Sequence, residues 1–197
     1  DMVWITNSQG IVEYINPAFE AATGFSAEEA QGRKVGSLMK SGRHDQDFYA
    51  RMWAQLLEGQ PYRDVFTNRT RDGREIHIDE TITPVRDKHG HITHFIATGR
   101  DITERLALED RLRQLAYYDP LTGLPNRTHF EEHLTQSLAR AEQSGHALAL
   151  LMLDLDRFKD LNDSLGHATG DELLIQVGHR LWDAVRPSDL VTRLGGD

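Results

Sequence analysis

Three consecutive segments with alternating apolar and polar residues constrain the fold of this chain more than any other feature. They are YRDVFTNRT (62–70), REIHIDETITPV (74–85) and ITHFIATG (92–99), and the turns RDG and KHG separate them. Alternation with a period of two is typical of strands that bury one face. Short turns that end in glycine join antiparallel neighbours. The sequence therefore predicts a meander of three antiparallel strands.

The residues before this meander predict a hairpin followed by helices. VWIT (3–6), the turn NSQG and IVEYIN (11–16) make up the hairpin. Short helical pieces follow around 17–24 and 26–32, where Ser26 and Glu29 have the spacing of a capping box. A longer helix over 45–59 ends at Gly59 and repeats apolar residues at helical spacing, which predicts one buried face: Phe48, Met52 and Leu56.

Composition excludes several functions. Acidic residues outnumber basic ones, 31 to 22, which argues against a nucleic-acid surface. The chain has no cysteine, so disulfides, thiolate metal sites, covalent haem and flavin chemistry that needs a cysteine adduct are all ruled out. No apolar run approaches the roughly 20 residues of a membrane helix, and we expect a cytoplasmic location. Because the first residue is Asp, we expect a fragment, whose full-length protein could carry a membrane anchor.

The order of two strands, several helices and three strands, with GIVEYINPAFEAATGFSAEEAQGR (10–33) and GRDITER (99–105), resembles the PAS sensor family. The resemblance covers 1–103. It implies a five-stranded antiparallel sheet with helices over one face. The hollow between the sheet and the helices then holds either a ligand or side chains.

Residues 41–73 are similar to the flavin-binding redox and aerotaxis subgroup of PAS sensors, in which Trp53 and Asn68 match a helix tryptophan and a strand asparagine. The resemblance implies that these two residues bind FAD. Trp53 could equally complete the core and Asn68 bond to backbone, and Tyr62 stands where the subgroup usually has tryptophan. Haem fits less well, because we expect the histidines of this region at the surface: His44, His77, His89, His91 and His94.

A helical linker is predicted over 104–118. Leu108, Leu112 and Leu115 recur at spacings of four and three between charged residues. Such a stripe packs either against a second copy of the helix, giving a homodimer, or against the chain's own domains.

The second half predicts helices around a buried strand. A helix with Pro125 in its first turn runs to Gly145, with a buried stripe of Phe130, Leu134 and Leu138. ALALLMLDLD (147–156) then predicts a central strand, buried on both faces, that carries Asp154 and Asp156 to a sheet edge. A later helix carries an apolar stripe, and DLVTRLGG (189–196) returns as a strand. The stripe consists of Leu173, Leu174, Val177, Leu181 and Val185.

This arrangement would bring Asp154 and Asp197 together at one edge. Two carboxylates beside a lysine, here Lys159, suit phosphoryl or nucleotidyl transfer with Mg²⁺. Solvated surface aspartates are the alternative interpretation.

DPLTGLPNR (119–127), LDLDRFKDLNDSLGHATGD (153–171) and RLGGD (193–197) resemble the GGDEF domain of diguanylate cyclases, which make cyclic di-GMP from two GTP. The resemblance implies an α+β, ferredoxin-like or palm-like fold over 119–197. It also implies a domain cut after the third letter of its signature, so that the fragment alone is inactive.

Carried over by position, the resemblance assigns roles to individual residues. It implies that Asp154, the Leu155 carbonyl and Asp197 hold Mg²⁺ or Mn²⁺, and that Asp197 helps to deprotonate the 3′-hydroxyl of GTP. Asn162 and Asp171 would recognise guanine. The phosphates and ribose would lie against the remaining matched residues: Phe158, Lys159, His167, Gly195 and Gly196.

Arg186 and Asp189, in RPSD, stand five residues before the paired glycines, where many such cyclases have an inhibitory site for their product. Taken alone, the two residues could be a surface pair. Two other functions stay open. LTGLPNR and LGHATGDELL also look like GGDEF domains that precede an EAL phosphodiesterase domain and regulate it by binding GTP. The fragment could also serve mainly as a sensor and dimerisation unit.

Overall fold

The computed structural model describes residues 1–195. They form two compact units, Asp1–Ala107 and the residues from Leu108 onward. All strands that the structure describes belong to the first unit, and the described part of the second unit is helical.

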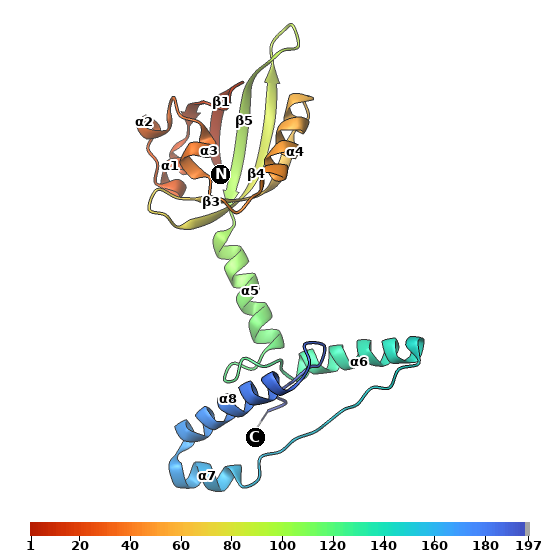
Figure 1. Cartoon of the computed structure of the whole chain (residues 1–197). Helices are drawn as coiled ribbons and strands as arrows, with labels where there is room; N and C mark the ends of the chain where they lie inside the picture. The colour runs from red at the N-terminus through yellow and green to blue at the C-terminus, as the bar shows by residue number, and fades with distance from the viewer. Residues whose placement is uncertain (196–197) are drawn as a thin grey trace. The chain divides into compact units, whose positions relative to one another are not determined.

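The first unit is built on one antiparallel sheet of five strands (Figure 1). Its strands are β1 (Met2–Asn7), β2 (Val12–Ile15), β3 (Tyr62–Arg69), β4 (Glu75–Arg86) and β5 (Ile92–Asp101). Their order across the sheet is β2-β1-β5-β4-β3. The predicted hairpin and meander are both confirmed, and β1 pairs with β5 to join them.

Four helices connect β2 to β3 and pack over one face of the sheet (Figure 1): α1 (Pro17–Thr23), α2 (Ala27–Ala30), α3 (Val35–Met39) and α4 (Gln46–Leu57). Their starts are capped as the sequence predicts, since Ser26 and Glu29 form both bonds of the capping box. The Asp45 carboxylate accepts a hydrogen bond from the backbone N–H of Phe48. The short helix α3 was not predicted, because it has no capping side chain and only five residues.

The core of the first unit lies between the helices and the inward face of the sheet. Phe48, Met52 and Leu56 of α4 are buried, as predicted, against β3 and β5. A second cluster joins the sheet to α1 and α3, and its members include Trp4, Phe19, Met39, Ile76 and Ile78. Residues of both clusters line the cavity that forms the first candidate site.

Strand β5 leads directly into helix α5 (Thr103–Tyr117). His77 of β4 holds this junction, because its carbonyl accepts from the N–H of Ile102 at 2.9 Å and its N–H donates to Thr103 Oγ1 at 2.8 Å. The helix predicted for the linker is confirmed. Its leucine stripe is exposed: Leu108 at 55%, Leu112 at 66% and Leu115 at 61%.

The second unit contains α6 (Arg127–Ser144), α7 (Phe158–Leu165) and α8 (His167–Ala184). Helix α6 ends at Gly145, as predicted, and the left-handed φ of 69° at this position explains the glycine. Pro125 was predicted to lie in the first turn of α6. It lies before the helix instead, and directly precedes the N-cap residue Asn126. The predicted buried stripe of α6 is also wrong, because α6 has no buried residue and Leu138 is exposed.

Both strands predicted for the second unit are absent from its described residues. Residues 147–155 form no strand, and Leu151 and Met152 are exposed; residues 189–195 form no strand either. A strand buried on both faces needs a hydrogen-bonded neighbour on each side. No described residue of this unit supplies one. The expected sheet edge therefore does not bring Asp154 and Asp156 to a shared site. Asp197 and Gly196 lie outside the described residues.

Across residues 1–195, no helix combines the length and apolar character needed to cross a membrane.

Candidate functional site

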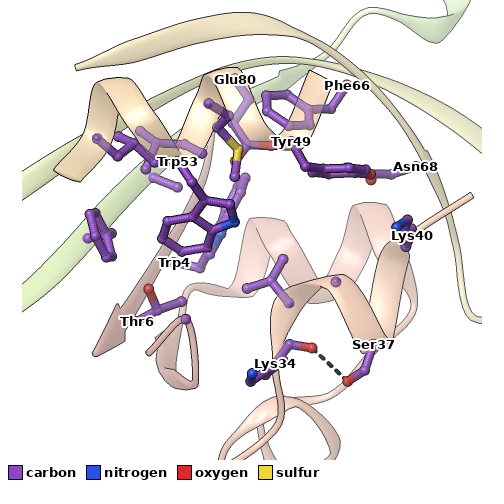
Figure 2. Close-up of a pocket in the computed structure, with 18 of the residues that line it drawn as sticks. Trp4, Thr6, Lys34, Ser37, Lys40, Tyr49, Trp53, Phe66, Asn68 and Glu80 are labelled. Carbon is purple, nitrogen blue, oxygen red and sulfur yellow. Dashed lines mark hydrogen bonds between the residues drawn. The ribbon is translucent and has the colours of Figure 1, made fainter. Parts of the chain in front are cut away.

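The first unit contains a cavity of about 430 Å³ between the inward face of the sheet and helices α3 and α4 (Figure 2). This volume lies within the range of small-molecule sites, roughly 300–1,000 Å³. Most of its walls are apolar. The residues lining its interior include Trp4, Thr6, Tyr49, Met52, Trp53, Leu56, Phe66, Asn68, Glu80, Ile82, Phe95 and Ala97.

Trp53 and Asn68, the two residues predicted to bind a cofactor, both line this cavity. The Trp53 ring packs edge-on against Phe95, with 5.5 Å between ring centroids. Asn68 is only 7% exposed, and its side-chain amide makes no hydrogen bond to any residue from 1 to 195. The alternative in which Asn68 bonds to backbone is therefore wrong. A buried amide without a partner is suited to a polar ligand. The binding of FAD itself stays a prediction.

Glu80 is a cavity residue that the sequence interpretation missed. Its side chain is 4% exposed and points into the cavity beside Phe66 and Tyr49 (Figure 2). Burial raises the pKa of Glu80 to about 8. Burial, with the nearby charge of Glu80 as a second cause, also raises the pKa of Tyr49. Strand alternation could have revealed Glu80, because it shares the inward face of β4 with Ile76 and Ile78.

Two lysines lie where α3 meets the cavity. Lys34 and Lys40 flank α3 and contribute to its lining. The Lys40 ammonium stands 4.5 Å from the centroid of the Tyr49 ring. The polar groups of the site therefore differ by depth, with an acid and an amide buried and two exposed cations near α3.

The histidines of the first unit are only partly at the surface, contrary to prediction. His89 and His91 are exposed, whereas His44, His77 and His94 are half-buried. His44 Nε2 accepts the N–H of Thr67 at 2.8 Å, and its ring stacks on Phe48 with 4.0 Å between centroids. None of these residues lines the cavity.

In the second unit, Asp119 links two of the three motifs, because this residue of DPLTGLPNR bonds to Arg193 of RLGGD. Its carboxylate accepts hydrogen bonds from the N–H of Thr122 at 2.9 Å, from Thr122 Oγ1 at 2.7 Å and from Arg193 Nη1 at 2.9 Å. The Arg193 N–H also donates to the Pro125 carbonyl at 3.0 Å. Burial by itself would raise the pKa of Asp119, but these hydrogen bonds and the guanidinium lower it overall. The DPLTG turn therefore holds the segment that leads to the paired glycines.

Helices α7 and α8 bring Asn162 close to the start of α8. A Cβ built on Gly170 would lie 1.9 Å from Asn162 Oδ1 and 3.2 Å from the Phe158 ring, so a larger residue here would require the Asn162 side chain to move. Asn162 Oδ1 is buried and has no hydrogen-bond partner among the described residues. Asp171, the other predicted guanine contact, follows Gly170 directly and is exposed. Asn162 therefore lies against the residue that directly precedes Asp171.

The remaining predicted site residues of the second unit are mostly exposed. Asp154, Lys159 and His167 are exposed, and Leu155 is half-buried. Within residues 1–195 no group of three or more His, Asp and Glu side chains is close enough to hold a metal ion. Gly195 has φ of 120°, a conformation that favours glycine. The predicted partner of Asp154, Asp197, is not described.

Arg186 and Asp189 lie in one turn after α8. The Asp189 carboxylate accepts the N–H of Arg186 at 3.1 Å, and the Asp189 N–H donates to the Arg186 carbonyl at 2.9 Å. Arg186 and Asp189 are therefore held next to each other in an exposed turn.

Comparison with known proteins gives a match for each unit. Residues 1–102 match the family model described as PAS fold, and residues 116–197 match the model described as diguanylate cyclase, GGDEF domain. The chain is 32% identical to the probable diguanylate cyclase DgcE of Escherichia coli (strain K12) over 194 residues, 94% of this chain and 17% of that protein. It is 30% identical to the cyclic di-GMP phosphodiesterase PdeB of Shewanella oneidensis over 199 residues, 100% of this chain and 22% of that protein.

The chain thus spans less than a quarter of the length of either relative. Among solved structures, an RNA-binding light-oxygen-voltage receptor is 28% identical, with a TM-score of 0.51. That likeness covers 58% of this chain and 33% of the receptor chain.

Proposed function

Because this chain belongs to the PAS and GGDEF families, we propose that it makes cyclic di-GMP from two GTP under the control of a PAS ligand. Its relatives place it among signalling proteins of the diguanylate cyclase and phosphodiesterase family. We assign residues 1–103 to the sensor, 104–118 to the connecting helix and 119–197 to the catalytic domain. The observation that supports this proposal is the close approach of Asn162 to Gly170, the residue before Asp171.

Guanine suits the chemistry of this pair. Asn162 Oδ1 is a buried acceptor without a donor among residues 1–195, and guanine offers N–H donors on one edge. The exposed Asp171 carboxylate accepts from the same kind of edge, whereas adenine lacks that set of donors. The pair therefore favours GTP over ATP.

The reaction joins two nucleotides. The 3′-hydroxyl of each GTP attacks the α-phosphorus of the other. Each attack forms one new P–O bond and breaks the bond to the β-phosphate, so two pyrophosphates leave for each cyclic di-GMP formed. Asp197 takes up or relays the proton of the 3′-hydroxyl. Lys159 offsets negative charge on the phosphates, with Phe158 and His167 beside the ribose and Gly195 and Gly196 against the nucleotide.

The exposed carboxylate of Asp154 and the carbonyl of Leu155 would hold Mg²⁺ or Mn²⁺ together with Asp197, since hard divalent cations prefer oxygen ligands. When bound, such an ion screens the triphosphate and favours ionisation of the attacking hydroxyl.

Because each domain holds one GTP, synthesis needs two domains face to face, and hence a homodimer. The exposed leucine stripe of α5 supports pairing of two connecting helices. Cyclic di-GMP would inhibit synthesis through Arg186 and Asp189, since a guanidinium and a carboxylate in one turn can bind phosphate and guanine together.

For the PAS domain we propose a flavin, with FAD as the specific candidate. Trp53 and the unpartnered amide of Asn68 line one cavity of suitable size, and the exposed Lys34 and Lys40 flank α3 where phosphates could lie. The solved receptor of similar fold is described as a light-oxygen-voltage receptor. Since this chain has no cysteine, a light-driven cysteine adduct cannot form, and we propose that the flavin responds to redox state.

A second candidate function is a regulatory domain that binds GTP without turnover and controls an EAL phosphodiesterase domain. The phosphodiesterase PdeB favours it, because it is about as similar to this chain as the cyclase DgcE.

The test is formation of cyclic di-GMP from GTP with Mg²⁺ by the natural protein that carries this chain. We expect turnover in the wild type, none in Asp197→Asn, and unchanged turnover in the control Asp163→Asn on the exposed face of α7. GTP binding without product in the wild type would establish the regulatory function instead. Absence of GTP binding would refute both.

A further inference from the structure

Glu80 is a buried acid of the PAS cavity whose chemistry the proposed function does not yet use. It is buried in the sheet, 4% exposed, and its carboxyl makes no hydrogen bond or ion pair with any residue from 1 to 195. A buried carboxyl without a partner costs several kcal/mol when ionised. Such a group is normally satisfied by a ligand or stays neutral.

The position of Glu80 aims it at the ligand space. On β4 it shares the inward face with Ile76 and Ile78, where apolar residues are expected. Its neighbour on β5 is Gly99, which has no side chain to reach it, and its neighbour on β3 is Asp64. The Asp64 carboxylate is exposed and accepts a hydrogen bond from Tyr62. Figure 2 shows the Glu80 side chain between Phe66 and Tyr49, above the Trp53 ring.

No described cation neutralises this acid. The titratable groups near Glu80 on the neighbouring elements are Tyr49 of α4 and Asp64 of β3, and neither is a cation. The lysines that reach the cavity lining are Lys34 and Lys40, next to α3, and Lys40 stands over the ring of Tyr49. His44 is hydrogen-bonded to Thr67 and does not line the cavity. The carboxyl is therefore best accommodated as the neutral acid, which is a hydrogen-bond donor.

We propose that the protonated carboxyl of Glu80 donates a hydrogen bond to an acceptor on a planar heteroaromatic ligand in this cavity, so that ligand binding is linked to the proton on Glu80. A flavin ring, flat and edged with carbonyl oxygens and ring nitrogens, has the required chemistry. This inference rests on the proposed function, because it assumes that the PAS cavity holds a flavin. It adds that Glu80 makes flavin binding depend on pH.

The sign of the pH dependence follows from the state of the free protein. Burial raises the pKa of Glu80 to about 8, so the donor is present at neutral pH and is lost as the pH rises past that value. If only the protonated form binds well, apparent affinity falls with the protonated fraction, about tenfold at one pH unit above the pKa.

The experiment titrates FAD into the whole chain by fluorescence, from about two pH units below that pKa to about one unit above it. Glu80→Gln keeps a neutral donor of the same shape but cannot titrate. The matched control is Glu75→Gln, the same change on the same strand, at a side chain that pairs with Arg43 outside the cavity.

We expect the wild type and Glu75→Gln to lose about tenfold in FAD affinity at the upper pH. Glu80→Gln should bind with nearly constant affinity over the whole range. Equal pH dependence in the wild type and Glu80→Gln would overturn the inference but leave FAD as the ligand. Absence of FAD binding by all three proteins at every pH would overturn the proposed ligand and this inference together.

A second measurement needs no variant. Calorimetry of FAD binding to the wild type, in two buffers of different ionisation enthalpy, counts the protons exchanged. We expect uptake approaching one proton at the upper pH and none at the lower. No uptake at the upper pH would overturn the inference even if Glu80→Gln fails to fold.

Discussion

Replacing Gly99 by alanine should destabilise the PAS domain, although Gly→Ala in a strand usually stabilises. Gly99 lies on β5 between Met2 of β1 and Glu80 of β4. A Cβ at this position would stand 2.6 Å from Ile78 Cγ2 and 3.3 Å from the Trp4 ring. Carbon atoms pack best at roughly 3.5–4.0 Å. The sheet or the Trp4 ring must therefore shift to accept the added methyl group.

The expected magnitude comes from two opposing effects. Overpacking a well-filled core costs about 1–3 kcal/mol, and removing the conformational freedom of glycine returns about 0.5–1 kcal/mol. Because the 2.6 Å contact lies far inside the packing distance, the upper half of the overpacking range applies. We therefore expect Gly99→Ala to lower the free energy of unfolding by about 1–2.5 kcal/mol. Urea unfolding followed by tryptophan fluorescence measures it, and the slope should stay unchanged.

Gly36→Ala is the matched control within the same domain. Gly36 lies in helix α3, and a Cβ there would meet nothing within 4 Å. Alanine should stabilise this helix by about 0.5 kcal/mol, because glycine is the poorer helix former. A Gly99→Ala protein as stable as the wild type would refute the packing argument, as would shifts of the same sign in both variants.

Three further predictions test other parts of the chain. Because the folded-state pKa of Asp119 is lowered from its usual 3.8, its stabilisation is present above that value and is lost as the pH falls through the folded-state pKa. Asp119→Asn should therefore lower stability at neutral pH by about 1–3 kcal/mol and have little effect in acid, as urea midpoints at both pH values would reveal. Because the pKa of Glu80 is raised from 4.5 to about 8, the stability of the ligand-free wild type should fall as the pH rises between these values. Glu80→Gln should remove that decline, and a decline of equal size in the variant would contradict the assignment. Leu112→Glu should leave the free energy of unfolding of the PAS domain within about 0.5 kcal/mol of the wild type. If the leucine stripe forms the proposed homodimer, light scattering should give a dimer for the wild type and a monomer for this variant; a dimer in both would place the interface elsewhere.

The PAS half of the fold could be predicted because its information is local. Each strand carries its own alternation, the turns RDG and KHG set the pairing, and Ser26 with Glu29 marks a helix start within four residues. Helix α3 escaped prediction because it lacks a capping side chain and is stabilised by the burial of Leu38 and Met39.

The second half was harder to predict because its apolar pattern depends on distant partners. Residues 147–153 have the composition of a buried strand, yet a strand forms only where neighbours complete its hydrogen bonds. Among the site residues, Trp53 and Asn68 were found by resemblance. Glu80 was missed because a glutamate in an alternating strand is ordinarily placed on the exposed face. The Asp119–Arg193 pair joins residues 74 positions apart, which no local pattern reveals.

The short junction between β5 and α5 has a consequence for engineering this protein. Only Ile102 separates the strand from the helix, and His77 holds the residues on both sides of that point. The first turn of α5 therefore has a fixed angle about the helix axis relative to the sheet. Each residue inserted into α5 rotates everything after it by about 100° and advances it by about 1.5 Å. Insertions of one to three residues should thus sharply change the rate at which the proposed cyclase makes cyclic di-GMP. An insertion of seven residues, close to two full turns, should largely restore the wild-type rate.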